Sequence, residues 1–126
     1  MKVIHKLIIT LSIGVATGAA IVEALHAQSR PPVYVVGEIE VTDQATYDIY
    51  SKGQSELVPS FGGQFLARGG KTESIAGTPP RSRAVLIKFE SMEKVQAWRT
   101  SPKFKELAVP RDKGANFRAY AIEGVN

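Results

Sequence analysis

Apolar and polar residues alternate along VYVVGEIEV, residues 33–41. The odd positions carry valine, glycine and isoleucine, and the even positions carry Tyr34, Val36, Glu38 and Glu40. A period of two places successive side chains on opposite faces of a strand. This segment is therefore predicted to be a first β-strand, which begins directly after the stiff, proline-containing linker SRPP.

The spacing becomes helical in the next segment, TDQATYDIYSKGQSELVPSFGG. Thr42 or Asp43 can cap the start of a helix, Gly53 weakens its middle, and Pro59 with the following glycine pair ends it. The apolar side chains fall on one stripe, which we expect to pack under a sheet. This stripe consists of Tyr47, Tyr50, Leu57, Val58 and Phe61.

The rest of the chain predicts three more strands and a second helix. QFLAR, residues 64–68, is a short strand that we expect to continue unevenly through KTESIAG, and AVLIKFE, residues 84–90, is the third. The helix opens at Ser91 and restarts where Ser101 caps it and Pro102 is its first residue. A loop, PRDKGA, then leads to the last strand, NFRAYAIEG.

The predicted order of strand, helix, strand, strand, helix, strand defines a fold class. It is α+β, a ferredoxin-like split βαββαβ domain with a four-stranded antiparallel sheet and two helices on one face. The uncovered face is too apolar to sit easily in water, so it predicts a partner, and a second copy of the chain is the simplest. Its apolar residues are Tyr34, Val36, Leu66, Ala84 and Leu86.

The first residues have the order of a signal peptide. Lys2 and Lys6 precede an uncharged run over residues 7–22, and Ala27 is the expected last residue removed. Cleavage would leave a domain exported to the periplasm or secreted, with a single folded domain at residues 33–126 behind a linker at residues 28–32.

An uncleaved N-terminal anchor is the alternative to export in soluble form. Leu25 is larger than the small residue preferred two places before a cleavage site. The membrane is therefore a partner only if this segment is retained.

Two residue types are missing from the expected mature domain. The chain has no cysteine, and its two histidines, His5 and His26, lie in the segment expected to be removed. This excludes Ser-His-Asp and Cys-His catalysis, histidine-ligated haem and most transition-metal sites, so we expect no metal and no cofactor. Any proton transfer would use Glu, Asp, Lys or Tyr.

The charge is mildly basic and does not predict a nucleic-acid partner. The net charge of +4 falls to +3 when two lysines and Glu23 leave with residues 1–27. Basic residues between Arg99 and Lys113 are interleaved with Glu106 and Asp112, which is typical of a solvated helix face. RNA-recognition domains need stacking aromatic residues on their central strands, which AVLIKFE lacks.

Several segments resemble domain-of-unknown-function family 1330, in the dimeric α+β barrel superfamily. They are YVVGEIEVTDQATYDIY, GGQFLARGGKTESIAG, PPRSRAVLIKFESMEKVQAWRTSPKFKEL and FRAYAIEG, and Phe104 stands where the family commonly has tyrosine. The resemblance implies a dimer whose two sheets pack into a barrel. Relatives in the wider superfamily include monooxygenases, isomerases and haem-degrading enzymes, whereas family 1330 has no agreed reaction.

Strand parity predicts a charged cluster inside that barrel. Glu38 and Glu40 share a face, and Arg68, Lys88 and either Arg118 or Tyr120 can join them, with Tyr34 and Leu86 as an apolar wall. Such a cluster could bind a small polar or anionic molecule, or it could be an ion-pair network that only fixes the dimer. A cation beside Glu38 lowers its pKa, which favours binding over proton abstraction.

Three further features each have two interpretations. Trp98 is either helix-to-sheet core or a stacking platform for a ligand, and Ser101 is either a cap or a nucleophile. FGGQFLARGGKTE resembles a phosphate loop, but its order is helix end, strand and turn, the reverse of a phosphate loop. The residue of interest in this stretch is Arg68, which lies between the two glycine pairs.

Three functional hypotheses remain open at this point. The first is an exported homodimer that binds a small polar or anionic organic molecule in the barrel interior. The second is a cofactor-independent enzyme, similar to a monooxygenase or an isomerase, and the third is a structural dimer without a pocket. The residues do not decide between an enzyme and a binding protein.

Overall fold

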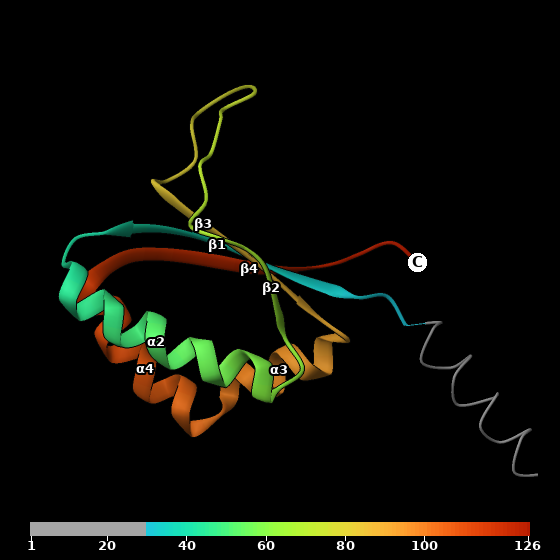
Figure 1. Cartoon of the computed structure of the whole chain (residues 1–126). Coiled ribbons are helices and arrows are strands. Elements are labelled where there is room, and N and C mark those ends of the chain that lie inside the picture. Colours follow the sequence, from blue (N-terminus) through green and yellow to red (C-terminus); the bar gives the residue numbers. More distant parts are fainter. Residues whose placement is uncertain (1–29) are drawn as a thin grey trace, which may run out of the picture. The chain divides into compact units, whose positions relative to one another are not determined.

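A computed structural model describes residues 30–126, so the expected signal peptide and the first two residues of the linker lie outside the described residues. The strands form one antiparallel sheet in the order β2-β3-β1-β4. This is the predicted ferredoxin-like α+β fold (Figure 1). The elements are β1 (Val33–Val41), α2 (Gln44–Ser60), β2 (Gln64–Arg68), β3 (Arg83–Phe89), α3 (Met92–Thr100), α4 (Pro102–Gly114) and β4 (Ala115–Glu123).

The described residues hold three helices where two were expected, because the second one is divided at Ser101. The backbone of Ser101 is extended (φ −65°, ψ 149°), so it ends α3 and caps α4, with Pro102 directly after it. The expected loop PRDKGA is wrong, since α4 continues through Pro110 to Gly114. Leu107 before the proline is buried, and Arg111 after it packs on an aromatic ring, so tertiary contacts hold the helix on both sides.

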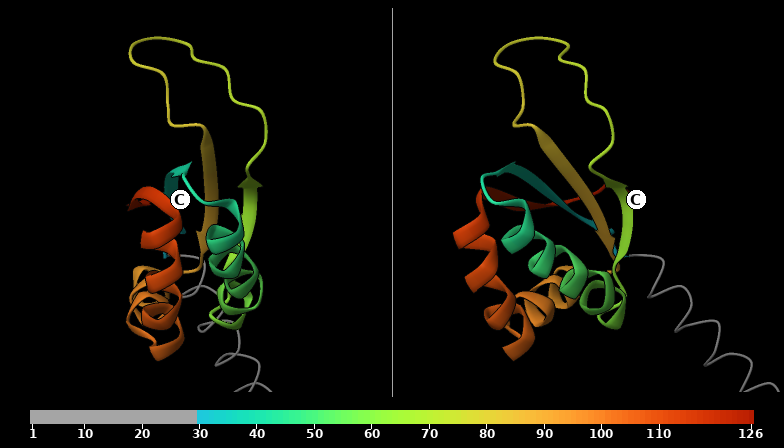
Figure 2. Two further views of the ribbon diagram at one scale, coloured as in Figure 1. Left: turned by 90° about the vertical axis from the view of Figure 1, so that its left-hand side faces the viewer. Right: turned by 60° about the vertical axis from the view of Figure 1, so that its left-hand side comes forward.

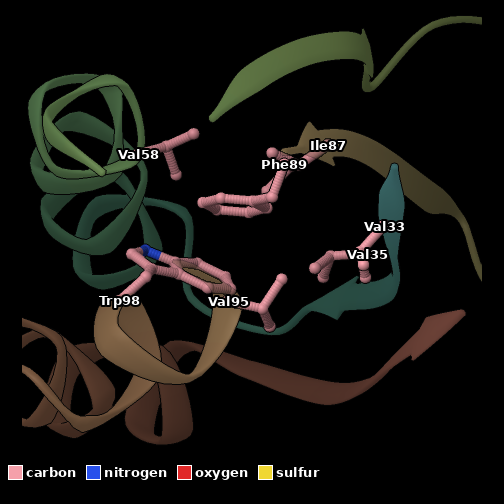
Figure 3. Packing of buried hydrophobic residues seen from close by; sticks show 7 residues of the cluster. All are labelled: Val33, Val35, Val58, Ile87, Phe89, Val95 and Trp98. Atoms are coloured by element: carbon pink, nitrogen blue, oxygen red, sulfur yellow. The ribbon is translucent and has the colours of Figure 1, made fainter. Parts of the chain in front are cut away.

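All three helices lie on one face of the sheet (Figure 2). The odd residues of β1 point toward them, and Val33, Val35 and Ile39 are at most 7 % exposed. One core cluster joins β1 and β3 to α3 and the end of α2, as Figure 3 shows. A second cluster joins Ile39 to Tyr47, Tyr50, Leu107 and Ala115. The predicted helical stripe is therefore confirmed for its two tyrosines and Val58.

The second strand is shorter than expected. β2 ends at Arg68, and residues 69–82 form a loop that projects from the body of the molecule (Figures 1 and 2). Gly69 begins the loop with a φ of 72°, a left-handed conformation that glycine adopts without strain. The expected continuation of the strand through KTESIAG is therefore wrong.

The face of the sheet away from the helices carries exposed apolar side chains, as predicted, but of the five predicted residues only Leu66 is exposed and the other four are half-buried. Leu66 is 46 % exposed, Tyr120 58 % and Ile122 54 %. The register places Tyr120 opposite Val36 and Ile122 opposite Tyr34, so these side chains form one patch. Among residues 30–126, no helix is long and apolar enough to cross a membrane.

Candidate functional site

Glu38 lies on the open face, where strand parity placed it. Arg118, directly opposite on β4, donates from Nε and Nη2 to Glu38 Oε2, over 2.8 Å and 2.7 Å. The backbone N–H of Arg81 donates to Glu38 Oε1 over 3.2 Å. The Arg81 hydrogen bond and the Arg118 guanidinium hold the pKa of Glu38 below its ordinary value of 4.5. Glu38 is therefore a poor general base, and it ties the projecting loop to the sheet.

The other charged residues of the predicted cluster do not reach Glu38. Lys88 lies opposite Tyr34, four residues along β1, which is about 13 Å at the usual rise of a strand. Glu40 accepts a hydrogen bond from Asn116 Nδ2 over 3.3 Å. The open face therefore holds a Glu38–Arg118 ion pair and not the wider cluster that was expected.

Arg68 lies on the opposite face of the sheet from Glu38, so its predicted place in the cluster is wrong. A β-bulge between Phe65 and Ala67 shifts the register, and Arg68 pairs with Val85 on the helix side. Its Nη2 donates to the backbone oxygen of Ser51 over 2.6 Å, and its Nη1 donates to Ser55 Oγ over 2.9 Å. One extra residue in β2 therefore converts an expected barrel residue into a link to α2.

Arg68 has hydrogen-bond partners but no counter-ion. No carboxylate among the described residues forms an ion pair with it. Burial lowers its pKa, and the neighbouring guanidinium of Arg83 lowers it further. Two cations therefore lie side by side on the helix side of the sheet, and burial makes this arrangement costly.

Trp98 belongs to the core, as one of its two interpretations predicted. It is 6 % exposed, and its ring centroid lies 5.2 Å from that of Phe89 and 4.8 Å from that of Phe104. Its Nε1 donates to Gln54 Oε1 over 3.0 Å. Ser101 is a cap, since its Oγ accepts from the backbone N–H of Phe104 over 3.3 Å. Trp98 nevertheless lines two hollow spaces.

The larger space is a groove of about 500 Å³ between β4 and the helices α3 and α4, which we call the β4 groove. Its floor includes Ala119 and Ala121, whose small side chains leave this part of the sheet open beside the helices. Aromatic rings and three arginines line it, and no carboxylate does. These residues are Trp98, Phe104, Phe117 and Tyr120, with Arg99, Arg111 and Arg118.

The three arginines of the β4 groove differ in whether a carboxylate of the protein pairs with them. The Arg111 guanidinium lies over the Phe117 ring, 4.7 Å from its centroid, and Asp112 accepts from its Nε over 2.9 Å. Arg118 is paired with Glu38. Arg99 makes no ion pair with any described residue. The groove therefore combines apolar walls with at least one uncompensated positive charge.

The smaller space, about 30 Å³, lies between the sheet and α2, and we call it the inner cavity. It shares Val35, Trp98 and Phe117 with the β4 groove. Its polar lining consists of Tyr50, Ser51, Gln54 and Arg68. Residues 30–126 contain no group of three His, Cys, Asp or Glu side chains placed to hold a metal ion.

Comparison with protein families identifies the domain. Residues 32–125 match a family described as "Domain of unknown function (DUF1330)". The chain belongs to DUF1330. The match spans every described strand and helix of the DUF1330 domain, including both hollow spaces. No curated protein matches the chain significantly.

Solved structures share the fold of this DUF1330 domain. A protein of unknown function from Rhodopseudomonas palustris aligns with a TM-score of 0.62 at 12 % identity, covering 83 % of this chain and 92 % of its own. SnoaB, a cofactor-independent oxygenase from Streptomyces nogalater, aligns with a TM-score of 0.56 at 11 % identity, covering 76 % of this chain and 95 % of its own. A dimeric ferredoxin-like protein of unknown function from Jannaschia sp. CCS1 aligns with a TM-score of 0.58 at 13 % identity, covering 73 % of this chain and 98 % of its own.

Sequence reasoning missed three residues that line the hollow spaces of the DUF1330 domain. Gln54 is 3 % exposed and occupies the helical stripe four residues after Tyr50, so a polar residue on an apolar stripe was the available signal. Arg99 and Arg111 were interpreted as part of a solvated helix face. The side chain of Arg111 is only 17 % exposed, which overturns that interpretation for this residue.

Proposed function

We propose that this DUF1330 protein is an exported homodimer that binds a small organic anion with an apolar body in the β4 groove. One observation carries the proposal: a groove of about 500 Å³ is lined by aromatic rings and three arginines, with no carboxylate among its lining residues. Small-molecule sites have this size and combine apolar walls with a few polar groups. The sequence analysis placed such a ligand inside the barrel, whereas the β4 groove lies on the helix side.

Arg99 is the proposed anchor for the charge of the ligand. It has no ion-pair partner among the described residues, and it lies on α3 next to the buried Trp98. Asp112 engages Arg111 through Nε, which leaves the two Nη groups of Arg111 for an anion. A guanidinium offers a planar set of donors that suits a carboxylate.

The homodimer is proposed from the open face of the sheet. Leu66, Tyr120 and Ile122 are each about half exposed there, and packing against a second copy would bury them. Proteins of this fold from Jannaschia sp. CCS1 and Thermobifida fusca are described as dimeric. Such a dimer would bury Tyr120, where the rim of the β4 groove meets the open face, and would leave the floor of the groove at Ala119 and Ala121 on the helix side.

A cofactor-independent reaction in the same groove is the alternative function. It is favoured by the shared fold with the oxygenase SnoaB. The described lining of the groove contains no carboxylate, histidine or cysteine, and Tyr120 is its one hydroxyl group that could transfer a proton. This lining favours binding over catalysis.

Trp98 provides the test of binding, because it is the only tryptophan of the chain and lines the groove. Titration with benzoate should change its fluorescence, and the neutral isostere benzamide should bind at least about tenfold more weakly because it lacks the charge. Arg99→Gln should weaken benzoate binding by a similar factor of about ten. Lys94→Gln, which removes one charge from the exposed part of the same helix, is the matched control.

Three results would reject the proposed function. They are no response to benzoate or to other aromatic and aliphatic carboxylates, equal binding of benzoate and benzamide, and equal effects of the Arg99 and Lys94 substitutions. The first of these would favour the structural dimer without a ligand.

A further inference from the structure

The inner cavity is a second hollow space, which shares Trp98 with the groove, and Gln54 sets its chemistry. The indole N–H of Trp98 can only donate a hydrogen bond, so the atom of Gln54 that faces it must be the amide oxygen. This fixes the orientation of the amide and directs Nε2, with its two hydrogens, away from Trp98. Nε2 is buried and makes no hydrogen bond to a described protein atom, although the Tyr50 hydroxyl lies near enough to interact with the amide.

The surroundings of Gln54 supply further donors and no anion. Arg68 lines the same cavity, and no carboxylate of residues 30–126 forms an ion pair with it. Tyr50 also lines the cavity, and burial raises its pKa to about 12, so it stays protonated and cannot serve as the counter-ion. The described lining therefore carries the positive charge of Arg68 and no negative charge to balance it.

The volume limits what can satisfy these donors. The cavity measures about 30 Å³, and a space of at least about 10–15 Å³ is needed to hold one water molecule. A monatomic ion of similar size fits, whereas an organic carboxylate such as the proposed ligand of the groove does not.

We propose that the inner cavity binds a halide-sized inorganic anion, received by Gln54 Nε2 and by the guanidinium of Arg68. The anion supplies the acceptor that Nε2 lacks and the negative charge that Arg68 lacks. Gly37, which lies in the centre of β1, also lines the cavity and leaves room for the ion beside the sheet. The site would hold its anion whether or not the groove is occupied.

Chloride is the probe, and the matched substitutions are made in full-length protein. Chloride-35 NMR line broadening and thermal unfolding in sodium chloride against sodium gluconate at equal ionic strength both report binding. We expect saturable broadening and a higher unfolding temperature in chloride. Gln54→Leu should weaken chloride binding by about tenfold or more, the loss expected for one hydrogen bond to a charged group.

Gln54→Glu is the sharper variant, because one carboxylate oxygen can still accept from Trp98 while the other replaces the donor. It should abolish the effect of chloride, whereas Gln96→Glu, the same change on the exposed part of α3, should leave it intact. Equal behaviour in chloride and gluconate, or equal broadening in the wild type and Gln54→Leu, would show that the cavity holds only water and would overturn the proposal. Arg99→Gln should leave the chloride effect unchanged, which separates this test from that of the groove.

Discussion

The open face of the sheet allows a quantitative prediction about the dimer. Ile122, on β4, is 54 % exposed. Complete burial of an isoleucine side chain stabilises a folded protein or a complex by about 1.5–3 kcal/mol. Burying the exposed half at an interface is then worth about 1–1.5 kcal/mol. A two-fold interface contains the residue twice, so Ile122→Ala should weaken the dimer by about 2–3 kcal/mol. This corresponds to a dissociation constant about 30- to 150-fold higher.

Sedimentation equilibrium over a range of protein concentrations measures this change directly. Val109→Ala is the matched control, because Val109 is 55 % exposed but lies on α4, on the helix side of the sheet. It should leave the dissociation constant unchanged. The reasoning is refuted if the two substitutions shift the dimer equally, or if Ile122→Ala has no effect while the wild type is a dimer.

Three further predictions concern stability. Lowering the pH from about 6 to about 3 should reduce the difference in unfolding free energy between the wild type and Glu38→Gln. The reason is that the stability contributed by the depressed pKa of Glu38 is lost as the pH falls below the ordinary value of 4.5. Chemical denaturation at each pH measures this difference, and a constant difference would contradict the prediction. Gly114→Ala should destabilise the folded protein by about 1–3 kcal/mol, because the added Cβ would come within 2.6 Å of the backbone of α2. The control is Gly70→Ala, whose Cβ meets nothing within 4 Å and which should leave the thermal unfolding nearly unchanged. Ser101→Ala should lower the unfolding free energy by about 1 kcal/mol through loss of the α4 cap, and an unchanged value would show that the cap contributes nothing.

The sequence alone was sufficient for the fold class and the open face. The alternation of residues 33–41 is a local property, because successive side chains of a strand always point to opposite faces. The capping roles of Asp43 and Ser101 were also readable, since each side chain accepts from a backbone N–H three residues on. These features depend on neighbouring residues only.

The place of Arg68 and the course of α4 depended on tertiary structure. A β-bulge of one residue reverses the parity of everything after it, and the glycine pairs that flank this strand do not reveal its position. Likewise, Pro110 predicts the end of a helix, but the packing of Leu107 and Arg111 outweighs that local preference.

The hollow spaces could not be derived from the sequence at all. The β4 groove exists because the helices leave the edge strand partly uncovered above Ala119 and Ala121, which is a matter of how three elements pack. The inner cavity depends on Gln54 and Trp98, 44 residues apart, meeting in one orientation. Local patterns therefore determined which elements form and which face of β1 each side chain takes, whereas the packing of helices on the sheet determined where a ligand could bind.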